Sequence, residues 1–134
     1  MDWSVLLPPL SPEPALDEPI SRYLRQSGHF SASNARVKPR AYHPAPADHK
    51  VSVFRVQGLT EVEIWLLGDA SVTGGLEARA DLSVAQVCET GLHLESAEPP
   101  IRHADIVGWP VEKDAWMSKA QELAAKAVLR LRHA

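Results

Sequence analysis

The stretch VSVFRVQGLTEVEIWLL, residues 51–67, decides the fold class, because it changes from a strand pattern to a helix pattern within a few residues. Its first part, Val51 to Val56, is short and rich in β-branched residues, which predicts a largely buried strand. Thr60 followed three residues later by Glu63 is a capping box, and a capping box indicates the start of a helix. A strand joined closely to a helix favours a domain that mixes both elements.

The rest of the chain carries the same two patterns. Apolar and polar residues alternate over 76–82 and 92–95, and residues 104–107 are similar, so three more short strands are expected. Ser83 with Gln86 forms a second capping box ahead of a short helix. That helix places Cys88 beside two valines on its apolar face, which predicts a core thiol.

Helical spacing predicts two further helices. Ile20, Tyr23 and Leu24 recur at i, i+3 and i+4 after Asp17, a residue type that caps helices. A longer stripe over 112–131 steps by four, three, four and four residues, which makes one continuous apolar face. We therefore expect an α+β domain with about four short strands in one sheet and a long C-terminal helix packed on it.

Residues 1–16 hold four prolines and read as an irregular arm, whereas residues 17–134 read as a single α+β domain. The arm is nonetheless apolar at Trp3, Leu6 and Leu7. Either it packs back onto its own domain, or these three residues contact a protein partner.

Composition and charge exclude several classes. The chain has 134 residues and a formal net charge of -3, which argues against a nucleic-acid binder. No apolar run approaches the length of a membrane span, and the acidic N-terminus is unlike a signal peptide, so a cytoplasmic protein is expected. Cys88 is the only cysteine, which excludes an internal disulfide. No nucleotide-loop, dinucleotide or metal motif is present, and no cofactor is expected.

The polar face of the predicted sheet is the first candidate site. It gathers two imidazoles with several carboxylates, a set that suits acid–base chemistry or a divalent metal. The alternative is that any sheet covered on one side needs a polar outer face. The residues concerned are Glu77, Arg79, Asp81, His93, Glu95, His103 and Asp105.

The second candidate site is basic. Residues 28–50 have a net charge of +3, and the sixty residues that follow have a net charge of -6. Arg36, Lys38 and Arg40 alternate, so in an extended chain they form one row of cations that suits a phosphate or carboxylate. Arg55 on the first predicted strand is a further candidate. The alternative is a loop that is neutralised by the acidic body of the protein.

Several short motifs together resemble a family of small, single-domain bacterial proteins to which no activity is attached. They include Arg36-Val-Lys-Pro39, Ser52-Val-Phe-Arg55, Ala78-Arg-Ala-Asp81 and the segment His103-Ala-Asp-Ile-Val-Gly-Trp-Pro110. The resemblance implies a bacterial, stand-alone domain. It supplies no catalytic residue, but it draws attention to the basic segment and to the corner that follows His103.

Two functional hypotheses remain. The first is a non-catalytic accessory module that binds a protein partner, because the arm is apolar, the chain has four tryptophans, and no catalytic signature is present. The second is a small enzyme or sensor for a phosphorylated or nucleotide-like ligand. In that case Arg36, Lys38, Arg40 and Arg55 bind the anion, and His103 with Asp105 transfers protons. Convergence of these side chains on one concavity would favour the second hypothesis.

Overall fold

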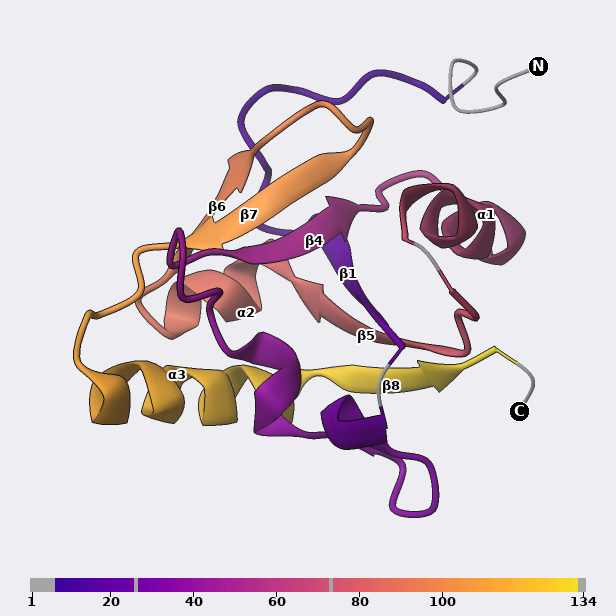
Figure 1. The fold of residues 1–134 in the computed structure, drawn as a ribbon. Helices are drawn as coiled ribbons and strands as arrows, with labels where there is room; N and C mark the ends of the chain where they lie inside the picture. The colour runs from indigo at the N-terminus through magenta and orange to yellow at the C-terminus, as the bar shows by residue number, and fades with distance from the viewer. Residues whose placement is uncertain (1–6, 26, 73, 133–134) are drawn as a thin grey trace.

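Six antiparallel strands form the main sheet, in the order β6-β7-β4-β1-β5-β8 (Figure 1). A computed structural model of the chain describes residues 7–25, 27–72 and 74–132. The strands are β1 (Pro19–Leu24), β4 (Val51–Arg55), β5 (Ala78–Ser83), β6 (His93–Ser96), β7 (His103–Val107) and β8 (Val128–Leu131). The four strands expected from alternation and β-branched residues are therefore present, and two more join them.

The first of the additional strands replaces the helix expected after Asp17, and that expectation is wrong. β1 pairs along its whole length with β5, from Pro19 opposite Ser83 to Leu24 opposite Ala78. Ile20 and Leu24 enter the core on one face of the sheet, while Tyr23 is buried on the other face. A strand with both faces covered carries apolar residues on both sides, and its sequence can therefore imitate helical spacing.

The single long C-terminal helix is also wrong, because it is a shorter helix followed by a strand. α3 (Lys113–Lys126) ends where the Ala127 N–H donates to the carbonyl of Leu123 at 2.9 Å. β8 then pairs with β5, with Leu131 opposite Ala78. Residues four apart lie on the same face of a helix, and they also lie on the same side of a strand. The apolar stripe therefore continues through the transition from α3 to β8 and does not reveal it.

Both predicted capping boxes are confirmed. Thr60 and Glu63 cap α1 (Glu61–Ser71), and Ser83 and Gln86 cap α2 (Val84–Glu89). Cys88, however, is exposed on α2, so the expectation of a core thiol is wrong. The short helix turns only Val84 and Val87 fully inward.

The segment between β1 and β4 folds into small elements that lie against α3. They are η2 (Ser27–His29), the two-stranded pair β2 (Phe30–Ser31) and β3 (Arg36–Val37), and η3 (Pro39–Tyr42). η3 packs directly on α3, in front of it in Figure 1. Pro39 suits the first turn of η3, since its missing N–H has no partner there in any case.

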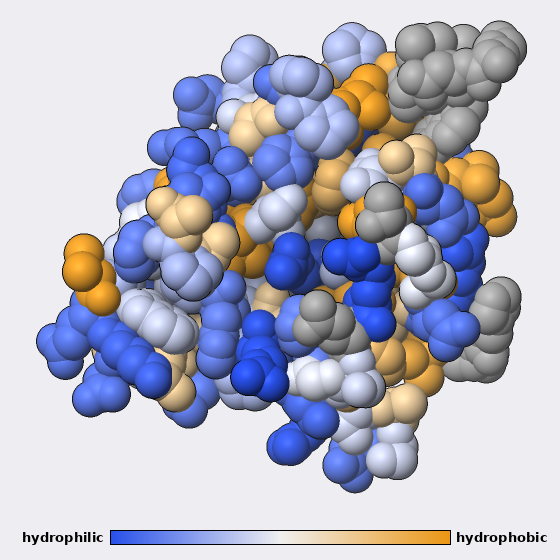
Figure 2. Space-filling model, in the orientation of Figure 1, coloured by the Kyte–Doolittle hydropathy of each residue, from blue (hydrophilic) through white to orange (hydrophobic). Residues whose placement is uncertain are grey.

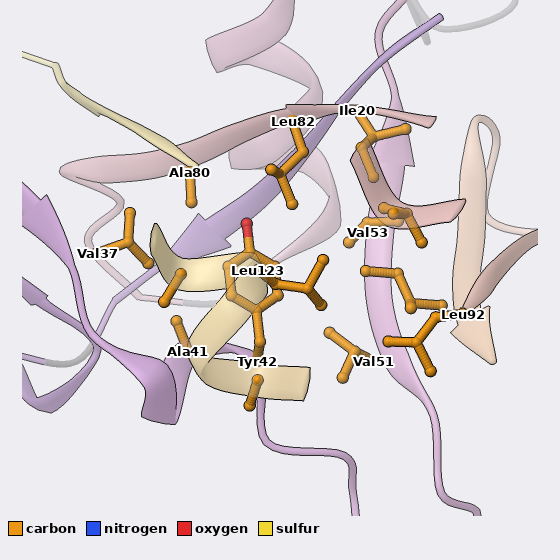
Figure 3. Packing of buried hydrophobic residues seen from close by; sticks show 14 of the residues in the cluster. Ile20, Val37, Ala41, Tyr42, Val51, Val53, Ala80, Leu82, Leu92 and Leu123 are labelled. Carbon is orange, nitrogen blue, oxygen red and sulfur yellow. The ribbon is translucent and has the colours of Figure 1, made fainter. Parts of the chain in front are cut away.

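The two faces of the sheet carry two separate cores. On one face, residues of β1, β4, β5 and β7 pack with α2, α3 and η3, and Figure 3 shows Tyr42 and Leu123 in the middle of this cluster. On the other face, α1 packs Ile64, Trp65 and Leu67 against Tyr23 and Phe54. Among the described residues, no helix has both the length and the apolar character needed to cross a bilayer.

The described part of the proline-rich arm lies against the domain. Leu7 is buried, and Arg102 Nη2 donates to the carbonyl of Pro8 at 2.9 Å. Farther along, the Ala85 N–H donates to the carbonyl of Leu16 at 2.8 Å. Where the structure describes it, the arm therefore packs back onto its own chain, which is one of the two expected outcomes.

Candidate functional site

A groove of about 750 Å³ opens between β1, the segment after it and α3, and we call it the basic groove. Its volume lies within the range of small-molecule binding sites. Figure 2 shows strongly hydrophilic side chains gathered near the middle of the face on which η3 lies. The groove is lined by Arg22, His29, Arg40, His43, Pro44, Ala45, Pro46, His49 and Trp116.

Arg22 is the fixed cation of the basic groove. It stands on β1 between Ser21 and Tyr23, so alternation directs it to the α3 side of the sheet. Its Nε donates to the carbonyl of Ala41 at 3.0 Å, and its Nη1 donates to the carbonyl of Ser52 at 2.9 Å. Burial is the main cause that lowers the pKa of Arg22 below its ordinary value, and an arginine stays charged at neutral pH even so.

His29 stands among cations. Burial lowers its pKa most, and the nearby charges of Arg22, Arg40, His43 and Arg25 lower it further. The backbone holds this arrangement, because the Lys38 N–H donates to the carbonyl of His29 at 2.9 Å. The imidazole is therefore neutral at pH 7 in the free protein, since its pKa lies below the ordinary value of about 6.5.

His43 and Trp116 form the aromatic wall of the groove. Their ring centroids are 5.1 Å apart and the rings meet edge to face at 71°. Burial lowers the pKa of His43, and the charges of Arg40 and Lys113 act in the same direction. Trp116 also packs against the main core, so this wall is anchored to the body of the domain.

A proline-bounded turn that carries His49 also borders the groove. The Ala45 N–H donates to the carbonyl of Lys50 at 3.0 Å, and the His49 N–H donates to the carbonyl of Ala45 at 2.8 Å. These bonds close the turn, so His49 and the two prolines stay beside the same opening.

The charges of the groove are not compensated locally. No acidic side chain is found among the described residues that line it. Within the part of the chain that the structure describes, neither Arg22 nor Arg40 forms an ion pair with a carboxylate. Two guanidinium groups and three imidazoles in one concavity suit an anion, because each presents N–H donors and the arginines add fixed positive charge.

A metal does not fit this set as well as an anion does. Across residues 7–25, 27–72 and 74–132, no group of three or more histidine, cysteine, aspartate or glutamate side chains is placed to hold a metal ion. The three imidazoles of the groove thus share an opening without forming a coordination site.

The basic row predicted from sequence does not stay together. Arg40 lines the groove, but Arg36 is exposed beside a separate depression on α3. Lys38 precedes η3, which bends the chain and ends the extended stretch on which the row depended. A ligand-binding role for Arg36 and Lys38 stays a prediction, and they do not share a site with Arg40.

Arg55 is part of a buried ion pair. Its Nε lies 2.5 Å from Glu18 Oε1 and its Nη2 lies 2.9 Å from Glu18 Oε2, and both side chains are only 4% exposed. A guanidinium held by both oxygens of a buried carboxylate is already neutralised. The pair joins β4 to the segment before β1 and lies apart from the basic groove.

His103 is held by hydrogen bonds on the opposite face of the sheet. Its Nδ1 lies 2.9 Å from the carbonyl of Ala97 and must donate to it, so in the neutral imidazole Nε2 accepts from the Ser52 hydroxyl at 2.6 Å. Asp105 Oδ1 is 3.6 Å from the same Nε2. A serine hydroxyl beside an imidazole nitrogen is the arrangement of a nucleophile next to a general base. Both hydrogen bonds of His103 also connect β7 to a neighbouring segment of the chain. The acid–base role of His103 and Asp105 stays a prediction, and neither residue lines the groove.

The rest of the predicted polar face forms ion pairs rather than an open cluster. Arg79 is 2% exposed, contacts Asp81 and Glu61, and lies 4.7 Å above the Trp65 ring. Asp81 also accepts from Ser21 Oγ at 2.6 Å. The remaining members, Glu77, His93 and Glu95, stand on exposed positions of the sheet and its ends.

Of the three arm residues expected to contact a protein partner, Leu7 is among the described residues. Trp3 and Leu6 lie outside the described residues. Leu7 is buried at 7% exposure, so in this state it does not offer its side chain to a partner. Partner binding by the arm stays a prediction.

Sequence reasoning missed most of the groove. Arg22 was hidden within a segment expected to be helical, and His29, His43, His49 and Trp116 are separated along the chain. The one available signal was the concentration of histidine and arginine between residues 22 and 49.

A scan against family models and searches of curated proteins and of solved structures found no match to the chain. The functional conclusion therefore depends on the chemistry of the groove.

Proposed function

We propose that the protein is a non-catalytic binding module for a small anionic ligand, which it holds in the basic groove. The supporting observation is that Arg22, Arg40 and three histidines line one concavity in which the described lining residues include no carboxylate. Cations without acidic partners attract and hold anions more strongly than cations in ion pairs do.

The proposal modifies the second hypothesis drawn from sequence. That hypothesis named an anionic ligand and placed it on Arg36, Lys38, Arg40 and Arg55. The proposed site keeps the ligand class and Arg40 and adds Arg22, whereas Arg55 is already paired with Glu18. No proton transfer is required of His103 in this function.

Arg40 and Arg36 supply a matched test, because both are exposed arginines of the same segment and only Arg40 lines the groove. We expect titration calorimetry with pyrophosphate at low salt to show saturable binding to the native protein. Arg40→Gln should weaken binding by about tenfold or more, because one hydrogen bond to a charged group contributes about 1.5–3 kcal/mol. Arg36→Gln should stay within about twofold of the native protein.

Two outcomes would contradict the proposal. If neither pyrophosphate nor sulfate binds at low ionic strength, where attraction between charges is least screened, the groove is not an anion site. If both variants lose the same affinity, the anion responds to general positive charge and not to this groove.

A further inference from the structure

The basic groove has two chemically different ends. Arg22, His29 and Arg40 form a charged end, in which each cation influences the pKa of His29. His43 and Trp116 form an aromatic end, with Pro44 beside them. Arg40 lies close enough to both histidines to lower the pKa of each, so the two ends adjoin.

The charged end is arranged for a compact group with several acceptor oxygens. Two of the five N–H donors of Arg22 are used on the carbonyls of Ala41 and Ser52, which fixes the guanidinium plane. The remaining donors have no protein acceptor among the described residues. A guanidinium held in this way loses little entropy when it binds a tetrahedral oxyanion, and arginine matches the spacing of phosphate oxygens.

The aromatic end offers a different kind of contact. Trp116 is partly buried against the main core and cannot swing away freely, yet it still lines the groove. Its edge-to-face contact with His43 fixes the orientation of both rings. Fixed aromatic and proline surfaces bind flat rings well, because little conformational freedom is lost.

We propose that the ligand is a phosphate monoester that carries a flat ring, such as a nucleoside 5′-monophosphate, with the phosphate on Arg22 and Arg40 and the ring against Trp116. This inference rests on the proposed anion-binding function. A groove of about 750 Å³ is larger than a lone phosphate needs, and its two ends match the two parts of such a ligand.

The test compares ligands that contain one or both parts. Titration calorimetry at moderate salt would measure binding of AMP, ribose 5-phosphate, inorganic phosphate and adenosine to the native protein. We expect AMP to bind at least about fivefold more tightly than ribose 5-phosphate, because stacking of a base on an aromatic side chain contributes about 1–3 kcal/mol. Adenosine should bind much more weakly than AMP, since it lacks the charged group.

Variants then locate the ring. Trp116→Leu should reduce the affinity for AMP to that for ribose 5-phosphate and leave ribose 5-phosphate unchanged. Trp65→Phe, on the opposite face of the sheet, is the matched control and should bind AMP like the native protein. The ligand comparison needs no variant, so it decides the proposal even if Trp116→Leu does not fold.

The outcomes separate this inference from the function on which it rests. Equal affinities for AMP, ribose 5-phosphate and phosphate would overturn the ring contact and leave the anion site intact. No binding of any phosphate would overturn both. A 5′-phosphorylated trinucleotide carries the same ring and phosphate chemistry as AMP. If AMP binds more tightly than the trinucleotide, the ligand is a free nucleotide. If the trinucleotide binds more tightly, the ligand is the 5′ end of a nucleic acid.

Discussion

At the scale of single residues, Gly68 shows how closely α1 approaches the sheet. A Cβ atom at this position would lie 2.4 Å from Leu76 Cδ2 and 2.7 Å from Tyr23 Cε1. The leucine tip can move, but the tyrosine ring is held by its hydroxyl, which donates to the carbonyl of Ile64 at 2.6 Å. Gly68→Ala should therefore destabilise the protein by about 1–3 kcal/mol through overpacking, despite the better helix propensity of alanine. Urea titration would measure the loss.

A second glycine supplies the control for that substitution. Gly75 has no atom within 4 Å of the position that its Cβ would take. Gly75→Ala should change the free energy of unfolding by less than about 1 kcal/mol. Equal effects of the two substitutions would show that contact between α1 and the sheet is looser than these distances indicate.

The environment of a charged residue could not be predicted from its type. Arginine and histidine were singled out as candidate site residues, but the sequence does not show that Arg55 is neutralised by Glu18, thirty-seven positions away. Nor does it show that Arg22 is clamped by the carbonyl of Ser52. Such partners are fixed by strand pairing, and pairing between distant segments leaves little local trace in one sequence.

At the scale of secondary-structure elements, α3 is the main support of the groove. It carries Trp116 on one turn and Leu123, which is 0% exposed, two turns later in the main core (Figure 3). Leu123→Ala should cost about 2–5 kcal/mol by leaving a cavity, a large part of the stability of a small domain. Chemical denaturation would measure this, with Val111→Ala as the control because Val111 is 83% exposed. A loss below about 0.5 kcal/mol for Leu123→Ala would mean that α3 is peripheral.

Elements with a local start signal were predictable, and those without one were not. The capping boxes at Thr60 and Ser83 mark their helices, because the hydrogen bonds that form them lie within four residues. β1 and β8 lack such signals. Both are strands because β5 lies between them and pairs with each, a tertiary effect that overrides their helical spacing.

At the scale of the whole molecule, protonation of several side chains lowers the stability of the folded state. Burial lowers the pKa of His29 and His43 in the folded state, so protonation opposes folding. The stability that depends on their neutral forms is complete above the unfolded pKa of about 6.5 and is lost as pH falls toward their folded pKa values. Hydrogen bonds from Arg79 and Arg132 lower the pKa values of Glu61 and Asp69, and their contribution is lost at lower pH, below about 4.5.

We therefore expect the melting temperature to be nearly constant between pH 8 and 7 and to fall in two stages on acidification. The double variant His29→Gln, His43→Gln, which cannot be protonated at these positions, should lack the first stage, below about pH 6.5.

Sulfate should offset the first stage in the native protein only, because a dianion in the groove favours the protonated imidazoles and binds the folded state selectively. Sulfate keeps its charge throughout this range, so the pH dependence reports on the protein and not on the ligand. Scanning fluorimetry across pH, with and without sulfate, would measure both effects. A melting temperature that rises between pH 7 and 5.5 would contradict the assignment of neutral, cation-surrounded histidines to the groove.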